Sequence, residues 1–270
     1  MHKFYKNYLT GMRIAYCIFM LICLNCCSDN NNGSNSSTNN SHANFLVVGV
    51  AADYPPFEFI QNGEFKGLDI DLINLIGKSL GRKIQFKDLN YSNLFAALNA
   101  GQIDVAISTI TFTEARNRNF DLSNPYHWSD IALIFKKDYP IKQIADLRDK
   151  TVGAQLGSTM EMWAIDCGQS IKLISMDVSL QLIEALKSNQ LDVVVSEAAQ
   201  AKEFCNRNSD LGYLVIAKSS NGYVIALKKG SKLLQEINSA LGVIQQHEKF
   251  NELKNKWLDI VFETEVHDAS

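Results

Sequence analysis

The chain has 270 residues, of which 46% are hydrophobic, 10% aromatic and 20% charged. This globular composition excludes a mostly disordered or collagen-like chain, and a net charge of −3 without a basic stripe gives no indication of nucleic-acid binding. At roughly 100–200 residues per domain, the length predicts one large domain or two small ones. Four of the six cysteines fall within the first 27 residues, so the beginning of the chain differs from the rest.

Residues 1–26 have the pattern of a secretory signal peptide. Three basic residues precede an apolar run at 14–24, which is shorter than the roughly 20 residues that a membrane span needs. The run ends in LNCC, which resembles a bacterial lipobox with Cys27 as the lipidated residue, although Cys26 stands where Gly, Ala or Ser is usual. A signal cleaved without lipidation, an uncleaved anchor and a start at Met12 are the alternatives.

Residues 28–44 read SDNNNGSNSSTNNSHAN and contain seven Asn and five Ser. Such a segment cannot bury a core, so residues 27–44 are predicted to be a lipid anchor and disordered tether. Both the inner and the outer membrane are possible locations for the anchor. Without residues 1–26 the chain holds 23 basic and 29 acidic residues, a net charge of −6. Cys167 and Cys205 then remain in the fold, either as a disulfide or as two buried thiols.

The globular part alternates predicted strands and helices. The strands are predicted at 45–50, 84–86, 103–107, 131–135, 151–154, 171–174 and 191–195. The helices are predicted at 68–80, 94–100, 144–148, from 159 onward, at 179–187 and at 197–208. Asn62-Gly63, between two apolar segments, predicts a hairpin turn. Alternation of this kind indicates an α/β protein with parallel strands.

The pattern repeats within the chain. LFAALNAGQIDVAIS (94–108) aligns with LIEALKSNQLDVVVS (182–196), with seven of fifteen positions identical. The segments 47–54 and 151–159 agree in kind, since each is a strand that runs into a loop. Coincidence between two generic helix–strand units is the alternative. The repeat predicts two similarly built lobes, each with its own small parallel sheet.

Ligands of open parallel sheets lie beyond the carboxyl ends of the strands. That rule selects four loops, two from each predicted lobe: 51–54, 108–113, 155–159 and 196–197. If the lobes face each other, these loops meet in one cleft, and interfaces of this kind are where small-molecule sites tend to lie.

The loops carry groups that suit a free amino acid. Arg116, one turn into a helix that Thr113 is predicted to cap, can hold a carboxylate through two hydrogen bonds. Glu197 can pair with an ammonium group, and the N-terminus of the helix at Thr159 can add backbone donors to the anion. Further hydroxyls and aromatic walls come from Tyr54, Tyr91, Ser108, Thr109 and Thr111.

Each of these residues also has a structural interpretation. Arg116 and Glu114 can form a solvated helix face, and Ser or Thr after a strand is often a cap. Glu197 can simply begin a helix, where acidic residues favour the dipole, and Tyr91 can serve only in packing.

Several long segments resemble one known family. They are VGVAADYPPFEFIQNGEFKGLDIDLINLIGKSLG, NLFAALNAGQIDVAISTITFTEARNRNFDLSNPY, DLRDKTVGAQLGST and LDVVVSEAAQA. They are similar to bacterial solute-binding proteins for polar amino acids (family 3), from Phe45 to about Trp257. The resemblance implies a two-lobed, type II periplasmic binding protein-like α/β fold with two hinge crossovers. We expect lobe 1 at 45–129 plus 222–262 and lobe 2 at 130–221.

The resemblance also implies roles for single residues. Arg116 matches the arginine that holds the ligand carboxylate, and Glu197 matches the acidic residue that pairs with the ammonium. The other implied ligand contacts are Tyr54, Tyr91, Ser108, Thr109, Thr111, Gln155 and Thr159. Ala51 stands where members that bind basic amino acids often carry Asp, so Arg, Lys, His and Gln all stay open as ligands, with Asp53 or Gln155 as substitutes.

The function that the resemblance implies is capture of an amino acid by a lipid-anchored monomer on the periplasmic face of a membrane, and its delivery to an ABC permease. Cyclohexadienyl dehydratases resemble these proteins, so an enzyme with Glu197 as general acid is one alternative. A surface amino acid receptor without a permease is another. The five histidines are scattered, and no P-loop or nucleophile elbow is present, so we expect no metal, no cofactor and no nucleic-acid partner.

Overall fold

The computed structural model describes residues 45–258. The predicted signal peptide, Cys27 and the tether to residue 44 lie outside the described residues, as do residues 259–270. Within the described range, no helix combines the length and the apolar character needed to cross a bilayer.

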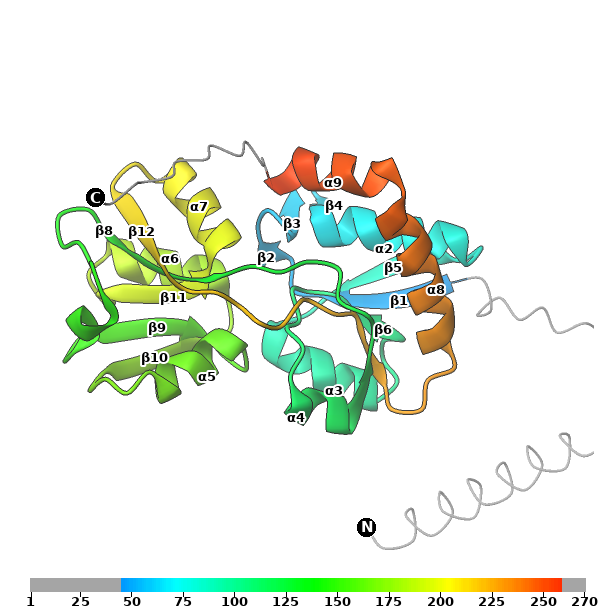
Figure 1. Ribbon diagram of the computed structural model, residues 1–270, viewed down its shortest axis with the longest axis horizontal. Coiled ribbons are helices and arrows are strands. Elements are labelled where there is room, and N and C mark those ends of the chain that lie inside the picture. Colours follow the sequence, from blue (N-terminus) through cyan, green and yellow to red (C-terminus); the bar gives the residue numbers. More distant parts are fainter. Residues whose placement is uncertain (1–44, 259–270) are drawn as a thin grey trace, which may run out of the picture. The chain divides into compact units, whose positions relative to one another are not determined.

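The first sheet has five strands in the order β5-β1-β6-β13-β7 (Figure 1). Its strands are β1 (Phe45–Val50), β5 (Lys83–Asp88), β6 (Val105–Ala106), β7 (Phe120–Leu122) and β13 (Ala226–Lys228). Strand β1 pairs in parallel with β5 and β6, whereas β13 runs antiparallel to β6 and β7. The apolar run of β1 is buried from both sides, as a central strand between two helical layers requires.

Helices cover both faces of this sheet, and we call the assembly lobe 1. On one face the core includes side chains from α2 (Leu68–Ser79), α8 (Leu233–Gln246) and α9 (Glu248–Leu258). On the other face it includes α3 (Leu94–Asn99), which follows the single-turn helix η2 (Tyr91–Asn93). The short helix α4 (Glu114–Asn119) packs against β7.

A three-stranded antiparallel sheet follows β1 in the chain. Its strands are β2 (Asp53–Tyr54), β3 (Glu58–Gln61) and β4 (Glu64–Lys66). The predicted turn is confirmed, since Asn62 and Gly63 have positive φ angles of 54° and 78° between the paired strands β3 and β4.

The second sheet, in lobe 2, has the order β10-β9-β11-β8-β12. Its strands are β8 (Ile131–Lys136), β9 (Thr151–Gln155), β10 (Lys172–Met176), β11 (Val193–Glu197) and β12 (Leu211–Ala217). Its helices are η3 (Ile144–Leu147), α5 (Thr159–Asp166), α6 (Ser179–Lys187) and α7 (Ala198–Arg207). The core on one face of the sheet includes α5, and the core on the other includes α6 and α7.

The internal repeat is confirmed by the pairing of the strands. In each sheet the second strand, β1 or β9, has parallel neighbours on both sides, and the two pairings beyond them are antiparallel. The aspartate that both copies of the repeat contain makes the same hydrogen bond in each lobe. Asp104 accepts from the N–H of Val47 at 2.8 Å, and Asp192 accepts from the N–H of Thr151 at 2.8 Å. The identical positions therefore reflect one structural unit used in both lobes.

Three strands that take part in the antiparallel pairings are the part of the sheets that the sequence pattern did not reveal. Strands β7, β12 and β13 were not predicted, and two of the four pairings in each sheet are antiparallel. Strands β7 and β13 have only three residues each, too few for a periodic signal. Cys167 and Cys205 are free thiols in the structure, so the alternative of two separate thiols is correct and the disulfide is not formed.

The chain crosses between the lobes twice, after β7 and after β12, and the two crossover segments run side by side (Figure 1). Tyr223, on the return crossing, donates its N–H to His127 O at 2.7 Å, and its own carbonyl accepts from the N–H of Tyr126 at 2.9 Å. The ring of His127 lies against Phe57 and Tyr223, with centroids 5.5 and 5.6 Å away. These segments form the hinge.

We expect the turn into α2 to tolerate only glycine. Gly67 has φ +127°, and a Cβ there would lie 2.0 Å from Phe57 O, whereas a Cβ on Gly63 (φ +78°) would meet nothing within 4 Å. Gly67→Ala should therefore lower the free energy of unfolding by at least about 3 kcal/mol, and Gly63→Ala by about 1 kcal/mol. Urea unfolding followed by circular dichroism measures both. Equal losses in the two variants would contradict this explanation.

Candidate functional site

The four loops selected from the sequence meet where lobe 1 faces lobe 2. Three of the contacts that bridge the lobes join these loops directly. The Thr159 hydroxyl donates to that of Thr111 at 3.2 Å, and the hydroxyls of Tyr54 and Ser196 are 3.5 Å apart. The third is made by Arg116, described next. The structure thus brings together residues from the carboxyl ends of β1, β6, β9 and β11, as the topology rule predicted.

Arg116 is held by three oxygen atoms. Its Nη1 donates to Thr111 O at 2.7 Å, and its Nη2 donates to the Tyr91 hydroxyl at 3.1 Å and to Gly157 O of lobe 2 at 3.0 Å. The guanidinium carbon lies 5.1 Å from the ring centroid of Phe95, a cation–π distance. Thr113 caps the helix by accepting the N–H of Arg116 at 3.1 Å, as predicted. Arg116 is therefore no freely solvated side chain.

The loop after β6 is fixed from behind. The Ser108 hydroxyl donates to Glu58 Oε1 at 2.7 Å and accepts from the N–H of Ala51 at 3.1 Å, so its hydrogen atom is already used. Thr109 has φ +46°, and its N–H donates to Asp69 Oδ2 at 2.9 Å. Both residues are buried, and Thr111 is only 7% exposed. Ser108 thus supports the loop with its side chain.

Glu197 is a buried carboxylate on the lobe 2 side. It is 5% exposed, and within the described part of the chain its Oε2 has no hydrogen-bond partner. Burial raises the pKa of Glu197 to about 7. Glu197 occupies the N-cap position of α7, yet its side chain makes no capping hydrogen bond. Glu197 thus begins the helix, as the structural alternative expects, but its side chain does not cap it. A buried acceptor oxygen remains without a donor.

Gln155 and Asp53, both considered above as contacts for the ligand side chain, also lie where the two lobes meet. The amide of Gln155, at the end of β9, donates to Asp177 O at 3.4 Å. Asp53 accepts the backbone N–H of Ser179 at the start of α6, so a lobe 1 carboxylate caps a lobe 2 helix that lacks a side-chain cap of its own. Burial raises the pKa of Asp53 to about 6.

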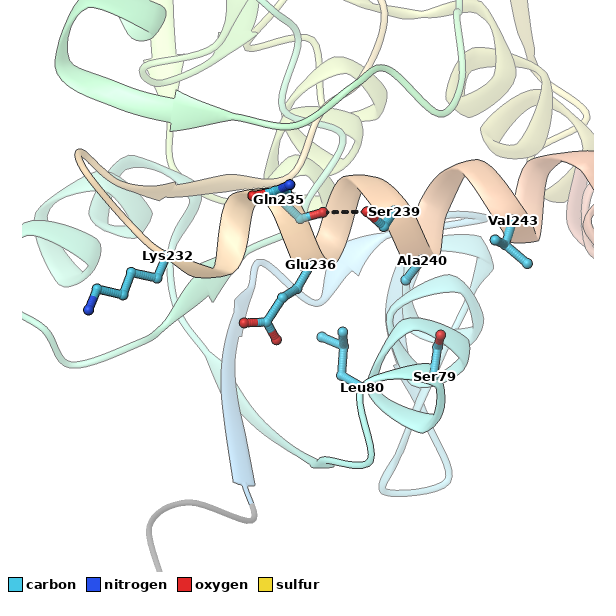
Figure 2. Close-up of a pocket in the computed structure, with 8 residues that line it drawn as sticks. All are labelled: Ser79, Leu80, Lys232, Gln235, Glu236, Ser239, Ala240 and Val243. Atoms are coloured by element: carbon cyan, nitrogen blue, oxygen red, sulfur yellow. Dashed lines mark hydrogen bonds between the residues drawn. The ribbon is translucent and has the colours of Figure 1, made fainter.

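A separate hollow of about 520 Å³ lies on lobe 1, between the end of α2 and α8 (Figure 2). It is lined by Ser79, Leu80, Lys232, Gln235, Glu236, Ser239, Ala240 and Val243. In Figure 2 the Ser239 hydroxyl points back to its own helix, where it donates to Gln235 O at 2.9 Å. None of the predicted site residues lines this hollow. Residues 45–258 also contain no group of three or more His, Cys, Asp or Glu that could hold a metal ion.

Sequence reasoning missed the groups that support the site. Glu58 and Asp69 hold the Ser108–Thr109 loop, and Ser92 donates to Asp177 across the lobes at 2.5 Å. The sequence does contain a signal that the two acids are buried, because each stands between two apolar residues: Glu58 in Phe-Glu-Phe and Asp69 in Leu-Asp-Ile. No comparable signal marks Ser92.

The comparisons with known proteins agree with this geometry. Residues 46–260 match the bacterial extracellular solute-binding proteins, family 3, and the chain belongs to this family. The arginine-binding extracellular protein ArtP of Bacillus subtilis is 32% identical over 217 residues, covering 78% of this chain and 85% of ArtP.

Solved structures share the fold. An ancestral arginine-binding protein bound to arginine is 36% identical with a TM-score of 0.74, covering 79% of this chain and 97% of that one. The same kind of ancestral protein bound to glutamine is 35% identical, with a TM-score of 0.74 and the same coverage. The chain therefore has the two-lobed α/β fold of amino acid-binding proteins, as predicted.

Glu197 should make the stability of the ligand-free protein depend on pH. Because its pKa is about 7 in the folded protein and 4.5 ordinarily, the folded state holds a proton that the unfolded chain has released. That favours folding at low pH, and the advantage is lost as the pH rises from 4.5 to about 7.

The variant Glu197→Gln removes this loss of stability at higher pH, because glutamine does not ionise. We expect the variant to exceed the parent in unfolding free energy by on the order of 3 kcal/mol at about pH 8, and by little at about pH 4. Thermal unfolding at both pH values measures the difference, and Glu114→Gln, at an exposed position, is the control. A stability difference that does not change with pH would show that Glu197 is not protonated by burial.

Proposed function

We propose that this protein captures a polar amino acid of the Arg/Lys/His or Gln class between its lobes and delivers it, unchanged, to the membrane subunits of an ABC permease. The observation that carries the proposal is the placement of Arg116 on lobe 1 and of the unpaired Glu197 on lobe 2. A free α-amino acid carries one negative and one positive group, which suit these two side chains.

The carboxylate end is supported by a set of donors. The guanidinium of Arg116 has five N–H donors in a planar fork, and the three bonds described above leave part of the fork for a ligand. Helix α5 begins at Thr159 with Ser158 as its N-cap, so its first backbone N–H groups are available to an anion. The Thr111 hydroxyl lies next to both, in contact with Thr159.

The ammonium end is supported by the buried, unpaired oxygen of Glu197. An ammonium group supplies the donors that this oxygen lacks, and its positive charge favours the ionised carboxylate against the effect of burial. Tyr54 and Tyr91 are both buried and polar at one end, so they can enclose the side chain of the ligand while their hydroxyls stay hydrogen-bonded. Gln155, Ser108 and Thr109 complete the proposed site.

Closure follows from the division of the site. We propose lobe boundaries at 45–129 plus 222–262 and at 130–221, with the crossovers around His127 and Tyr223 as the hinge. A ligand that touches both lobes stabilises only the closed form, so binding shifts the hinge equilibrium. Because Arg116 and Glu197 belong to different lobes, closure depends on both ends of the amino acid.

The proposed setting is the periplasmic face of a bacterial membrane. There the monomer is held by lipid on Cys27, after removal of residues 1–26, and by the tether to residue 44. The family description places its members outside the cytoplasm. ArtP is named for arginine, and the ancestral proteins were solved with arginine and with glutamine, which supports the ligand class.

One observation also favours an enzyme of the dehydratase type. A general acid near neutral pH needs a raised pKa, and the pKa of Glu197 is raised to about 7. We prefer binding without turnover because the family is one of solute-binding proteins. Incubation with prephenate and arogenate separates the two, since a binding protein returns both compounds unchanged.

A thermal-shift screen of the twenty amino acids should identify a ligand in the proposed class, and calorimetry then measures its affinity. Arg116→Ala should weaken binding at least about tenfold, because it removes a charge-assisted contact with the carboxylate. Arg118→Ala, an exposed residue on the same short helix, should bind like the parent protein. Unchanged affinity in Arg116→Ala would overturn the assignment of the carboxylate site.

A further inference from the structure

Two acids, Glu58 and Asp69, lie completely buried behind the loop that carries the proposed ligand residues. Glu58, in β3, is 1% exposed, and Asp69, in the first turn of α2, is 0% exposed. The main charged groups that act on Glu58 are carboxylates, Asp69 and Asp53. Two ionised carboxylates together in an apolar interior would be strongly unfavourable, so their charge state needs an explanation.

Each acid holds one residue of the loop. Glu58 Oε1 accepts the hydroxyl of Ser108 at 2.7 Å. Asp69 Oδ2 accepts both the N–H of Thr109 at 2.9 Å and the hydroxyl of Tyr126, from the first crossover, at 2.8 Å. The two carboxyl groups therefore connect the ligand loop to β3, to α2 and to the hinge.

The remaining oxygens of the two acids point to a shared proton. Within the described residues Glu58 Oε2 and Asp69 Oδ1 receive no N–H or O–H group, although both are buried. The two side chains are nevertheless within hydrogen-bonding reach of each other. Two carboxylates can form such a bond only if one of them carries a proton. Asp69 already accepts two donors and Glu58 only one, so the proton belongs on Glu58.

We propose that protonated Glu58 and ionised Asp69 form a positioning pair that holds the Ser108–Thr109 loop in its binding conformation. In this arrangement Glu58 donates to Asp69 Oδ1, and Asp69 accepts three hydrogen bonds. The pair also explains how Thr109 keeps a φ of +46°, a conformation that costs a residue with a side chain about 1 kcal/mol or more.

The surroundings favour retention of the proton. Burial raises the pKa of Glu58 well above 4.5 and that of Asp69 to about 6. Asp53 on β2 adds negative charge, and Tyr126 and Tyr223 from the crossovers face the pair as neutral hydroxyls. The effect on amino acid binding rests on the proposed function, but the shared proton does not.

The variants Glu58→Gln and Glu58→Leu separate the shared proton from simple packing. A glutamine has the shape of protonated Glu58: its amide nitrogen can donate to Asp69 while its oxygen accepts from Ser108. We expect Glu58→Gln to keep the affinity for the identified amino acid within about threefold. Glu58→Leu leaves Ser108 and Asp69 without partners and should weaken binding at least about tenfold.

Two measurements without ligand test the proton itself. As the pH rises above 4.5, the folding equilibrium constant of the parent should fall about tenfold more per pH unit than that of Glu58→Gln, because the parent retains one more proton on folding. Infrared difference spectra between the folded parent and folded Glu58→Gln at neutral pH, in which the shared contribution of Glu197 cancels, should show a protonated carboxylic acid band that only the parent has.

Several outcomes would overturn the pair. Glu58→Gln binding as weakly as Glu58→Leu would do so, as would equal pH slopes for parent and Glu58→Gln, or an unchanged carboxylic acid band. If Glu58→Leu does not fold, Glu58→Gln alone decides the matter through its slope and band. If no amino acid binds the parent, the proposed function fails, while slope and band still test the pair.

Discussion

The two crossovers between the sheets are the constraint on which the rest of the molecule depends. The chain leaves lobe 1 after β7 and returns after β12, and the crossing segments are hydrogen-bonded to each other through Tyr223 and its partners Tyr126 and His127. Two adjacent connecting segments permit rotation of one lobe against the other with little change inside either. In the closure that we propose, the contacts that change lie at the facing loops, where the predicted residues gather.

The balance of charge at those loops is the basis of the ligand that we propose. Arg116 is a cation held by neutral oxygens, and Glu197 is a buried acid whose Oε2 has no hydrogen-bond partner among the described residues. Each lobe is incomplete alone, because a buried charge without a partner costs free energy. A molecule with a carboxylate and an ammonium group resolves both deficits and joins the lobes as it does so. The contact of Arg116 with Gly157 O shows how near the lobes already lie.

Much of the fold could be predicted because its helices and central strands have strong periodic signals. The repeat at 94–108 and 182–196 was visible because Asp104 and Asp192 perform the same backbone task in both lobes. Strands β7 and β13 were missed, since three residues such as 226–228 carry no period and pair only through tertiary contacts. Chain topology, rather than propensity, creates them.

The meeting of the predicted loops could be foreseen, but the contacts that hold them could not. The strand-end rule selected four loops that the structure brings together, because the rule depends only on strand order. It could not show that the Ser108 hydroxyl is already used by Glu58, or that Asp53 caps a helix of the other lobe. Such roles depend on residues far apart in the chain that meet only in the folded protein. Buried acids within apolar runs, such as Glu58 and Asp69, are the sequence signal that deserves more weight.

Recognition of both charged ends of an α-amino acid, one by each lobe, is the core of the proposed function. Calorimetry with the amino acid found in the screen, with its decarboxylated amine and with its deaminated acid tests this directly on the unmodified protein. We expect removal of either end to weaken binding at least about a hundredfold, since each analogue leaves one charged group of the site unpaired and closure incomplete. Comparable affinity for the amino acid and either analogue would contradict it.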